Sequence, residues 1–152
     1  MIILLNHNIP EIASQILKLQ RESYQVEANL IDYQNIPYMK QGIEQIQNTN
    51  ESFIGYKIKN LLTGVISYEK RNHRNVTICR LIIKPDYFRK GIAEKLVVYI
   101  EEIEKKIQSI YVETAKKNLP AINLYYKLGY HTIRKFKTPD GLTIVGLIKV
   151  LE

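Results

Sequence analysis

Residues 85–93 (PDYFRKGIA) carry a combination of charge and small size that suits an anionic ligand. Arg89 and Lys90 precede Gly91 where an apolar strand pattern gives way to a helical one. The first turn of a helix leaves backbone N–H groups without internal partners, and the helix dipole adds about half a positive charge there. Because Gly91 has no Cβ and Ala93 is small, a ligand oxygen can approach these amides, and a pyrophosphate matches best. The alternative is that Gly91 is only a turn residue before a helix.

A second segment, residues 118–130 (NLPAINLYYKLGY), has well-marked helix ends. Asn118 is a plausible N-cap, Pro120 falls in the first turn, and Gly129 suits the left-handed position after the last turn. Asn118 and Tyr125 lie on one helical face, about 10 Å apart along the axis at 1.5 Å per residue. They can therefore contact two points of one elongated ligand.

Together the two segments resemble the GNAT acetyltransferases, which transfer an acyl group from coenzyme A to an amine. Members of that family carry Q/R-x-x-G-x-G/A after a central strand and, further along, N-x-x-A-x-x-L-Y-x-x-x-G-F/Y. The first pattern is matched at Gly91 and Ala93, whereas Phe88 stands where Gln or Arg is usual. The second pattern is matched completely, by Asn118, Ala121, Leu124, Tyr125, Gly129 and Tyr130.

The resemblance implies acetyl-CoA as the acyl donor and a defined place for it. Strand 76–84 would splay from strand 109–114, and the pantetheine arm would lie between them. A main-chain N–H would polarise the thioester carbonyl there. Asn118 and Tyr125 would also contact the cofactor. The arm would bond to the backbone of Leu81, Ile82 and Ile83, and the pyrophosphate to the amides of Arg89, Lys90, Gly91, Ile92, Ala93 and Glu94.

Catalytic roles follow from the same resemblance. Tyr125 is the expected general acid that protonates the leaving thiolate, since a phenol of pKa about 10 is a workable donor to a thiol of about 8.5. Its structural alternative is a buried tyrosine that only fills space. Glu113, at the end of strand 109–114, is a candidate general base, as in members that acetylate protein N-termini, with water relays as the rival. Tyr24 and Glu27 are candidates for binding a cationic acceptor.

The hydrophobic pattern predicts an α/β (α+β) domain in the order β α α β β β α β α β β. Its sheet would be mixed but mostly antiparallel, with about four flanking helices, and residues 1–152 would form a single GNAT domain. The predicted helices span residues 10–22, 38–47, 91–107 and 118–128. The predicted strands span residues 1–5, 52–60, 61–69, 76–84, 109–114, 130–137 and 142–151.

Composition narrows the class of protein further. The chain has 152 residues and a net charge of +7, and it contains neither GxxxxGK[ST] nor GxGxxG, which disfavours P-loop and Rossmann sites. Its three histidines are scattered, so no metal is expected. The single cysteine, Cys79, allows no internal disulfide and suits a cytoplasmic location. No stretch is apolar and long enough to predict a membrane span or a signal peptide.

The positive charge keeps a second class of function open. Residues 1–60 hold 5 bases and 6 acids, and residues 61–152 hold 17 bases and 9 acids, which would also suit a basic nucleic-acid-binding module. The dispersed tyrosines favour an enzyme over that module, so no nucleic-acid partner is expected. A GNAT-fold domain that binds CoA without catalysis is the third option. The acceptor, a small-molecule or peptide amine, and the oligomeric state, with a homodimer as one option, stay open.

Overall fold

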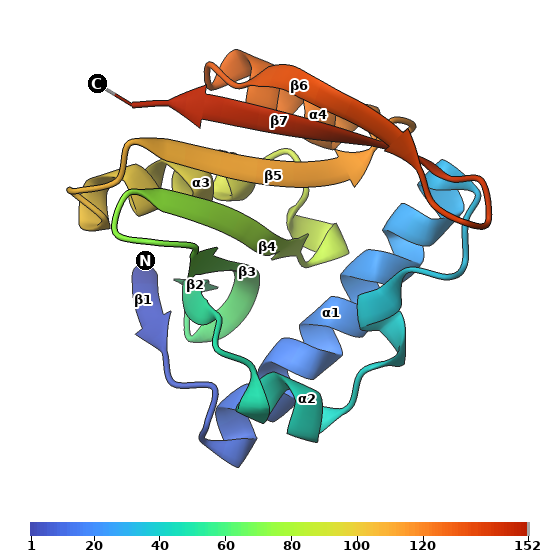
Figure 1. Cartoon of the computed structure of the whole chain (residues 1–152). Helices are drawn as coiled ribbons and strands as arrows, with labels where there is room; N and C mark the ends of the chain where they lie inside the picture. The colour runs from blue at the N-terminus through green and yellow to red at the C-terminus, as the bar shows by residue number, and fades with distance from the viewer. Residues whose placement is uncertain (152) are drawn as a thin grey trace.

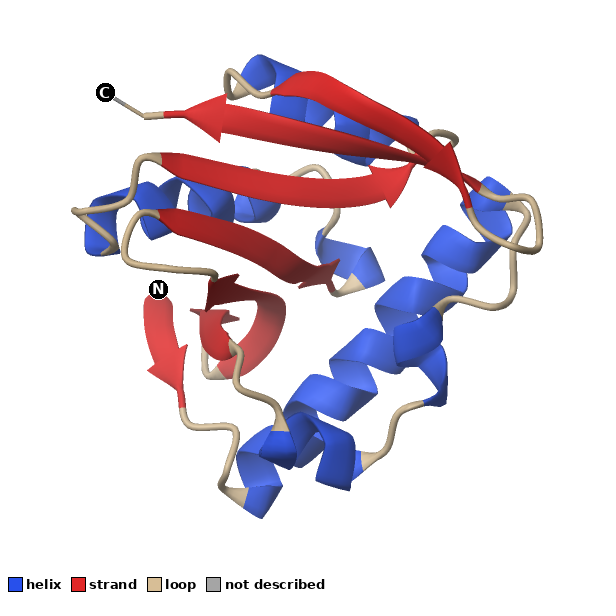
Figure 2. Ribbon diagram, in the orientation of Figure 1, coloured by secondary structure: helices blue, strands red, loops and turns tan. Residues whose placement is uncertain are grey.

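The computed structural model describes residues 1–151 and is built around one seven-stranded sheet (Figures 1 and 2). The order of helices and strands is the predicted one, with two short 3-10 helices added. Strand bounds agree with the predicted ranges within two residues. The elements are β1 (Ile2–Leu5), α1 (Pro10–Ile31), η1 (Pro37–Lys40), α2 (Ile43–Asn48), β2 (Ser52–Ile58), β3 (Leu61–Lys70), β4 (Asn75–Ile83), η2 (Pro85–Tyr87), α3 (Ile92–Ile103), β5 (Ser109–Ala115), α4 (Leu119–Lys127), β6 (His131–Lys137) and β7 (Thr143–Val150).

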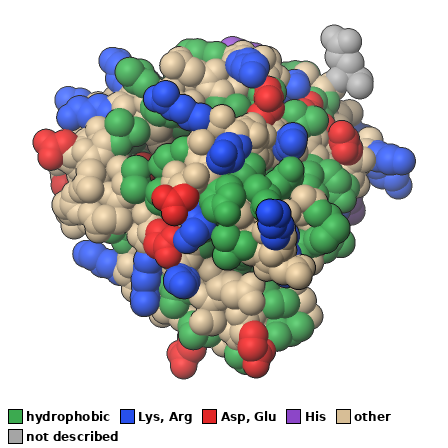
Figure 3. All heavy atoms as spheres, turned by 180° about the vertical axis from the view of Figure 1, so that it is seen from behind, with side chains coloured by type: hydrophobic (Ala, Val, Ile, Leu, Met, Phe, Trp, Pro, Cys, Tyr) green, Lys and Arg blue, Asp and Glu red, His purple; other side chains and the backbone are tan. Residues whose placement is uncertain are grey.

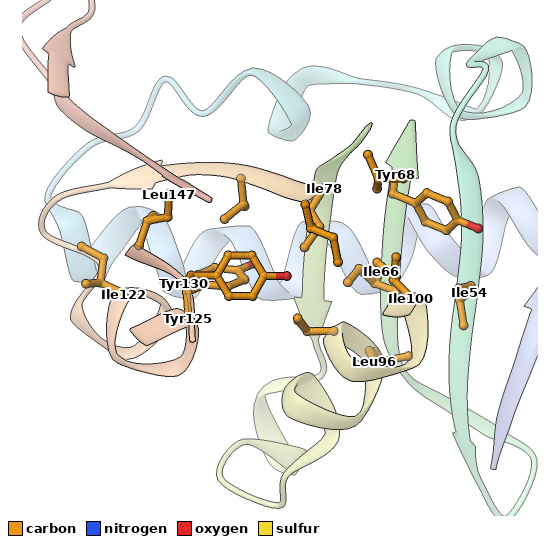
Figure 4. Packing of buried hydrophobic residues seen from close by; sticks show 14 of the residues in the cluster. Ile54, Ile66, Tyr68, Ile78, Leu96, Ile100, Ile122, Tyr125, Tyr130 and Leu147 are labelled. Carbon is orange, nitrogen blue, oxygen red and sulfur yellow. The ribbon is translucent and has the colours of Figure 1, made fainter. Parts of the chain in front are cut away.

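The sheet runs in the order β1-β2-β3-β4-β5-β7-β6 and is mixed, as predicted. Neighbours pair antiparallel, except β4 and β5, which pair in parallel. One buried cluster joins α1 and α2 to the sheet, and a second joins α3 and α4 to it. In Figure 4 the α3 residues Leu96 and Ile100 point towards the strands of that second cluster. Within residues 1–151, no helix is both long and apolar enough to span a bilayer.

The parallel strands β4 and β5 separate halfway along their length. Their pairing begins at Asn75 and Ser109 and ends at Ile78 and Val112. Beyond that point β4 continues to pair only with β3, and β5 only with β7. The predicted splay between these two strands is therefore confirmed.

A β-bulge at Cys79 coincides with this separation. Across the β3–β4 ladder, Ile78 faces Tyr68 and Arg80 faces Ser67, so Cys79 is an extra residue without a partner. Residues two apart on a strand normally share a face. Here Ile78 packs into the α3/α4 cluster, whereas the Arg80 side chain bonds to Gln20 of α1. The bulge thus reverses the side-chain alternation and bends β4 away from β5.

The predicted end of the first helix was wrong. The expected range was 10–22, but α1 continues to Ile31 because Tyr24, Ala28 and Ile31 extend its buried stripe. No proline or glycine interrupts the chain before the helix ends at Asp32, which adopts a left-handed conformation with φ 54°. The extra turns bring the C-terminal half of α1 alongside β4.

Two other helix predictions were too long. The range 38–47 divides into η1 and α2, since Gly42 is extended and forms the N-cap of α2, where its N–H donates to Gln45 Oε1 at 2.8 Å. The third helix, α3, ends at Ile103 instead of residue 107. Ile107 is buried all the same, as part of the connection to β5.

Arg80 is the largest fully buried side chain, and it forms an unusual polar cluster beneath α1. Its Nε and Nη2 donate to the two carboxylate oxygens of Glu51 at 2.8 and 2.9 Å. Nη1 donates to Gln20 and Gln41, at 2.8 and 2.7 Å. The guanidinium also lies 4.3 Å from the centre of the Tyr38 ring. Burial raises the pKa of Glu51, but hydrogen bonds from Arg80, Ser67 and Thr49 outweigh it and hold that pKa below its usual value.

We expect Arg80→Ala to lower the free energy of unfolding by about 3–5 kcal/mol, because it leaves the Glu51 carboxylate buried without its cation. The double variant Arg80→Met/Glu51→Met should recover most of this loss, since it removes both charges. Urea unfolding measures both. Lys84→Met is the control: it removes another ion pair to α1, Lys84–Glu22 at 3.0 Å, and should change stability little. Equal losses for Arg80→Ala and Lys84→Met would contradict the structural role of Arg80.

Candidate active site

Three adjoining hollows form one cleft through the gap between β4 and β5. The mouth hollow, about 380 Å³, lies beside the start of α3, and the central hollow, about 210 Å³, lies between the separating strands. These two share Glu27, Leu81, Asn118 and Ala121. The outer hollow, about 560 Å³, continues from the central one and shares eight lining residues with it: Tyr33, Pro37, Tyr38, Ile78, Cys79, Glu113, Leu142 and Ile144.

The start of α3 opens towards the mouth hollow. Gly91 forms the N-cap with φ 79°, and a Cβ built there would meet no atom within 4 Å. The backbone is therefore accessible at the helix N-terminus, where amide donors and the helix dipole favour an anion. Gly64 of β3 lets this end of α3 pack closely, because a Cβ at that position would lie 2.8 Å from Ile92 Cγ2.

The predicted cofactor residues differ in how they meet the cleft. Ile82 is fully buried on the α1 side of the sheet, and its side chain lines none of the three hollows. Lys90 does not line the mouth hollow either, and Glu94 pairs with Lys127 at 3.1 Å. Phe88, which replaces the usual Gln or Arg, lies on the wall and is 41% exposed. The others that line the mouth hollow are Leu81, Ile83, Arg89, Gly91, Ile92, Ala93 and Asn118.

Helix α4 carries Asn118 and Tyr125 to the central hollow. Asn118 is the N-cap, as predicted, and its Oδ1 accepts from Ala121 N at 3.3 Å. Tyr125 is 2% exposed and packs against Tyr130, with ring centres 5.1 Å apart (Figure 4). No group within residues 1–151 hydrogen-bonds to the Tyr125 hydroxyl, although that residue lines the central hollow. Burial raises the pKa of Tyr125, and the charge of Glu27 raises it further, so its phenol keeps its proton at neutral pH.

The two candidate carboxylates lie at opposite ends of the central hollow. Glu27 lines the mouth and central hollows, is half-buried, and has a pKa raised by that burial. It has no hydrogen-bonding or ionic partner among residues 1–151. Glu113 lines the central and outer hollows and is already engaged. It accepts from Tyr111 Oη at 2.7 Å and lies 3.8 Å from Arg134 Nη1.

Tyrosine side chains form much of the wall opposite β4. Tyr24 is 5% exposed, and its ring stacks on that of Tyr38 with centres 5.9 Å apart. Burial raises the pKa of Tyr24 well above its usual value, and burial with the charge of Glu51 raises the pKa of Tyr38 to about 12. Arg80 packs on Tyr38, with its guanidinium carbon 4.3 Å from the centre of that ring. The buried ion pair therefore supports the wall of the cleft.

A polar bridge ties two loops beside the outer hollow. Tyr33 Oη donates to Asp140 Oδ2 at 2.7 Å, and Asn35 Nδ2 lies 3.4 Å from the same oxygen. The sequence analysis missed Tyr33 and Tyr38 as cleft residues because they belong to a connection without a motif. The aromatic content of YQNIPY (residues 33–38) was the available signal. Among residues 1–151 no group of histidine, cysteine and acidic side chains could hold a metal ion.

The family of this chain follows from comparison with known proteins. The model of the acetyltransferase (GNAT) family matches residues 13–130. The chain therefore belongs to the GNAT family, and the resemblance found in its two motifs is confirmed.

Two relatives match different lengths of the chain. The UPF0157 protein YqkA of Bacillus subtilis (strain 168) is 38% identical over 144 residues, which cover 95% of this chain and 42% of that protein. The N-terminal acetyltransferase B complex catalytic subunit NAA20 of Arabidopsis thaliana is 31% identical over 85 residues, which cover 53% of this chain and 48% of that protein. Each match thus covers less than half the length of the relative.

A solved structure shares the fold over nearly the whole chain. PaiA N-acetyltransferase from Thermoplasma acidophilum, in complex with coenzyme A, superposes with a TM-score of 0.75 at 22% identity. The match covers 96% of this chain and 98% of that one. The predicted GNAT fold is therefore confirmed.

The reactivity of Cys79 tests the cleft directly. This thiol lines the central and outer hollows, and burial, with the charge of Glu51, raises its pKa to about 12. An ordinary thiol has a pKa of about 8.5, so we expect N-ethylmaleimide to label Cys79 at least about 100-fold more slowly than a cysteine peptide at pH 8. The rate should still rise at pH 10, where the peptide's rate has levelled off. Intact-mass measurements follow the reaction, with Cys79→Ser as the unlabelled control, and peptide-like rates would contradict this environment.

Proposed function

We propose that this chain is an acetyl-CoA-dependent N-acetyltransferase that acts on a primary amine by direct transfer in a ternary complex. The observation that carries the proposal is the continuous cleft from the open N-terminus of α3 to Tyr125, through the gap between β4 and β5. Membership of the family and the coenzyme A bound to a similar structure support it. The acceptor would be a small molecule or a peptide N-terminus.

The residues of the cleft suit the parts of coenzyme A. The mouth hollow offers backbone amides around Gly91, with Arg89 on its wall, for the pyrophosphate. The part of β4 beyond Ile78 has no partner on the β5 side, so its backbone is free to bond to the pantetheine arm at residues 81–83. Acetyl-CoA, when bound, supplies the activated acyl group.

Proton transfer falls to the side chains of the central hollow. Tyr125 holds its proton at neutral pH and would deliver it to the leaving sulfur. Glu27 has a raised pKa and no partner within residues 1–151, so it would bind the incoming ammonium group. Glu113 stays a candidate for the base, acting through water. The amine must lose its proton before it attacks, which favours an α-amine of pKa 7.7–8.0 over a lysine side chain of about 10.4.

The alternative of a nucleic-acid-binding module finds less support. Lys and Arg side chains are spread over the face shown in Figure 3, among hydrophobic patches, instead of forming one stripe. A thiol-release assay with acetyl-CoA and a screen of polyamines, amino acids, aminoglycosides and N-terminal peptides tests the transferase proposal. Release that depends on an amine supports it. Binding of acetyl-CoA without release from any amine would favour a CoA-binding domain without catalysis.

We expect Gly91→Glu to weaken acetyl-CoA binding by about 100-fold or more. The new carboxylate would occupy the open space at the start of α3 and repel the pyrophosphate. The pyrophosphate would then lose two or more charge-assisted hydrogen bonds to backbone amides, each of which contributes about 1.5–3 kcal/mol. Gly141→Glu is a matched control, because Gly141 also has a positive φ and open space around its Cβ position. It should carry the same backbone strain and bind normally. Calorimetric titration measures both, and equal affinity of the two variants would mean that the α3 mouth is only a turn.

Tyr125→Phe should lower kcat by about 100-fold or more while the affinity for acetyl-CoA stays within about threefold, because it removes only the proton donor. The fold should survive, since no group within residues 1–151 hydrogen-bonds to that hydroxyl. Tyr126→Phe is the control: Tyr126 is 50% exposed and contacts Thr132 at the surface. Steady-state kinetics and calorimetry separate the two effects. Turnover in Tyr125→Phe equal to that of Tyr126→Phe would remove the proton-donor role.

A further inference from the structure

The acceptor side of the cleft is mainly apolar and aromatic. It comprises the central and outer hollows, which together reach from Glu27 to the far end of the outer hollow at Arg71. Such a surface gains free energy by burying hydrocarbon, at roughly 25 cal/mol per Å². The apolar and aromatic residues that line it include Ile31, Tyr33, Ile36, Tyr38, Ile78 and Phe136.

Along this surface, Glu27 alone is a carboxylate without a partner among residues 1–151. It lies at the inner end. Glu113, further out, is held by Tyr111 and Arg134. At the outer end Arg71 lines the hollow, where its Nε donates to Thr77 Oγ1 at 3.1 Å and its Nη1 lies 3.3 Å from Glu69. One ammonium group is therefore matched at the inner end, whereas a second one would find no unpaired carboxylate among the described residues that line the outer hollow.

We propose that the acceptor is a primary amine with a single positive charge, carried at the end of an elongated and mostly apolar chain. This inference rests on the transferase function proposed above. The ammonium group binds at Glu27, the chain lies along the tyrosine wall, and the far end reaches Phe136 and Arg71. Polycations such as polyamines and aminoglycosides are excluded because like charges brought together in a cleft repel strongly.

The chemistry of transfer fits this orientation. The amine nitrogen forms a bond to the acetyl carbon as the carbon–sulfur bond breaks. Before the attack, the ammonium group gives one proton to water on the path to Glu113, so that the nitrogen reacts as the neutral amine. Tyr125 gives its proton to the sulfur, and the second proton released by the nitrogen returns to Tyr125 through water. The inner end of the acceptor surface is the end that borders Tyr125, because the central hollow contains both Tyr125 and Glu27. An amine held there is next to the proton donor, while its apolar chain extends away from the cofactor.

An acceptor panel tests this inference with the wild-type chain. The probes are octylamine, phenethylamine, a peptide with a free N-terminus and two apolar residues first, spermidine and tobramycin. We expect kcat/KM for the best single-charge probe to exceed that for spermidine and tobramycin by about tenfold or more. A preference for octylamine would indicate that the acceptor is a small amine. A preference for the peptide would indicate that it is a protein N-terminus. Equal or better use of the polycations would overturn the inference and leave the transferase function intact.

Arg71→Glu gives a sharper test, because it reverses the charge at the outer end. We expect this variant to raise the spermidine-to-octylamine ratio of kcat/KM by about tenfold. Arg74→Glu is the matched control, since Arg74 is exposed on the same turn and lines none of the three hollows. A ratio that moves equally in both variants would overturn the inference. Failure of every amine to release thiol, with acetyl-CoA bound, would overturn the transferase function and this inference together.

Discussion

The separation of β4 from β5 is the constraint on which the rest of the cleft depends. Two parallel strands that stayed paired to their ends would close the sheet and leave no opening between Ile78 and Tyr125. Pairing stops at Ile78 and Val112 because the bulge at Cys79 bends one strand. The backbone hydrogen-bonding groups that this gap leaves without strand partners are donors and acceptors next to a cavity. A local defect in the sheet ladder thereby becomes the place where a ligand chain can be held.

The same bulge explains why a charged residue lies in the core. By reversing the side-chain alternation, it turns Arg80 towards α1, where Glu51, Gln20 and Gln41 satisfy its donors. A buried ion pair is weak evidence for extra stability, since hydrophobic residues of the same volume often do as well. The contribution of Arg80 is to position aromatic side chains. It packs on Tyr38, which stacks on Tyr24, and both tyrosines line the central hollow.

The parts of this site that depend on residues close together in the sequence could be predicted from it. Gly91 and Asn118 mark helix starts, and Tyr125 follows from its place on the same helix as Asn118; the structure brings all three to one cleft. Tyr38, Arg80 and the Cys79 bulge were not predictable in this way. Their roles come from contacts between segments distant in sequence, such as Arg80 with Gln20 and Glu51. The end of α1 was missed for a related reason, because the stripe that extends the helix is buried only by packing against the sheet.

The extra residue in β4 also restricts how the length of this chain can change. Substitutions at Cys79 alter one side chain in the cleft. Loss of that position would instead remove the bulge, because Ile78 and Arg80 would become neighbours that keep their β3 partners, Tyr68 and Ser67. Arg80 would still face α1 and Glu51, but β4 would lose the bend that carries it away from β5. Descendants of this sequence can therefore change in composition along this strand, but deletion of the bulge residue would close the opening while leaving the core in place.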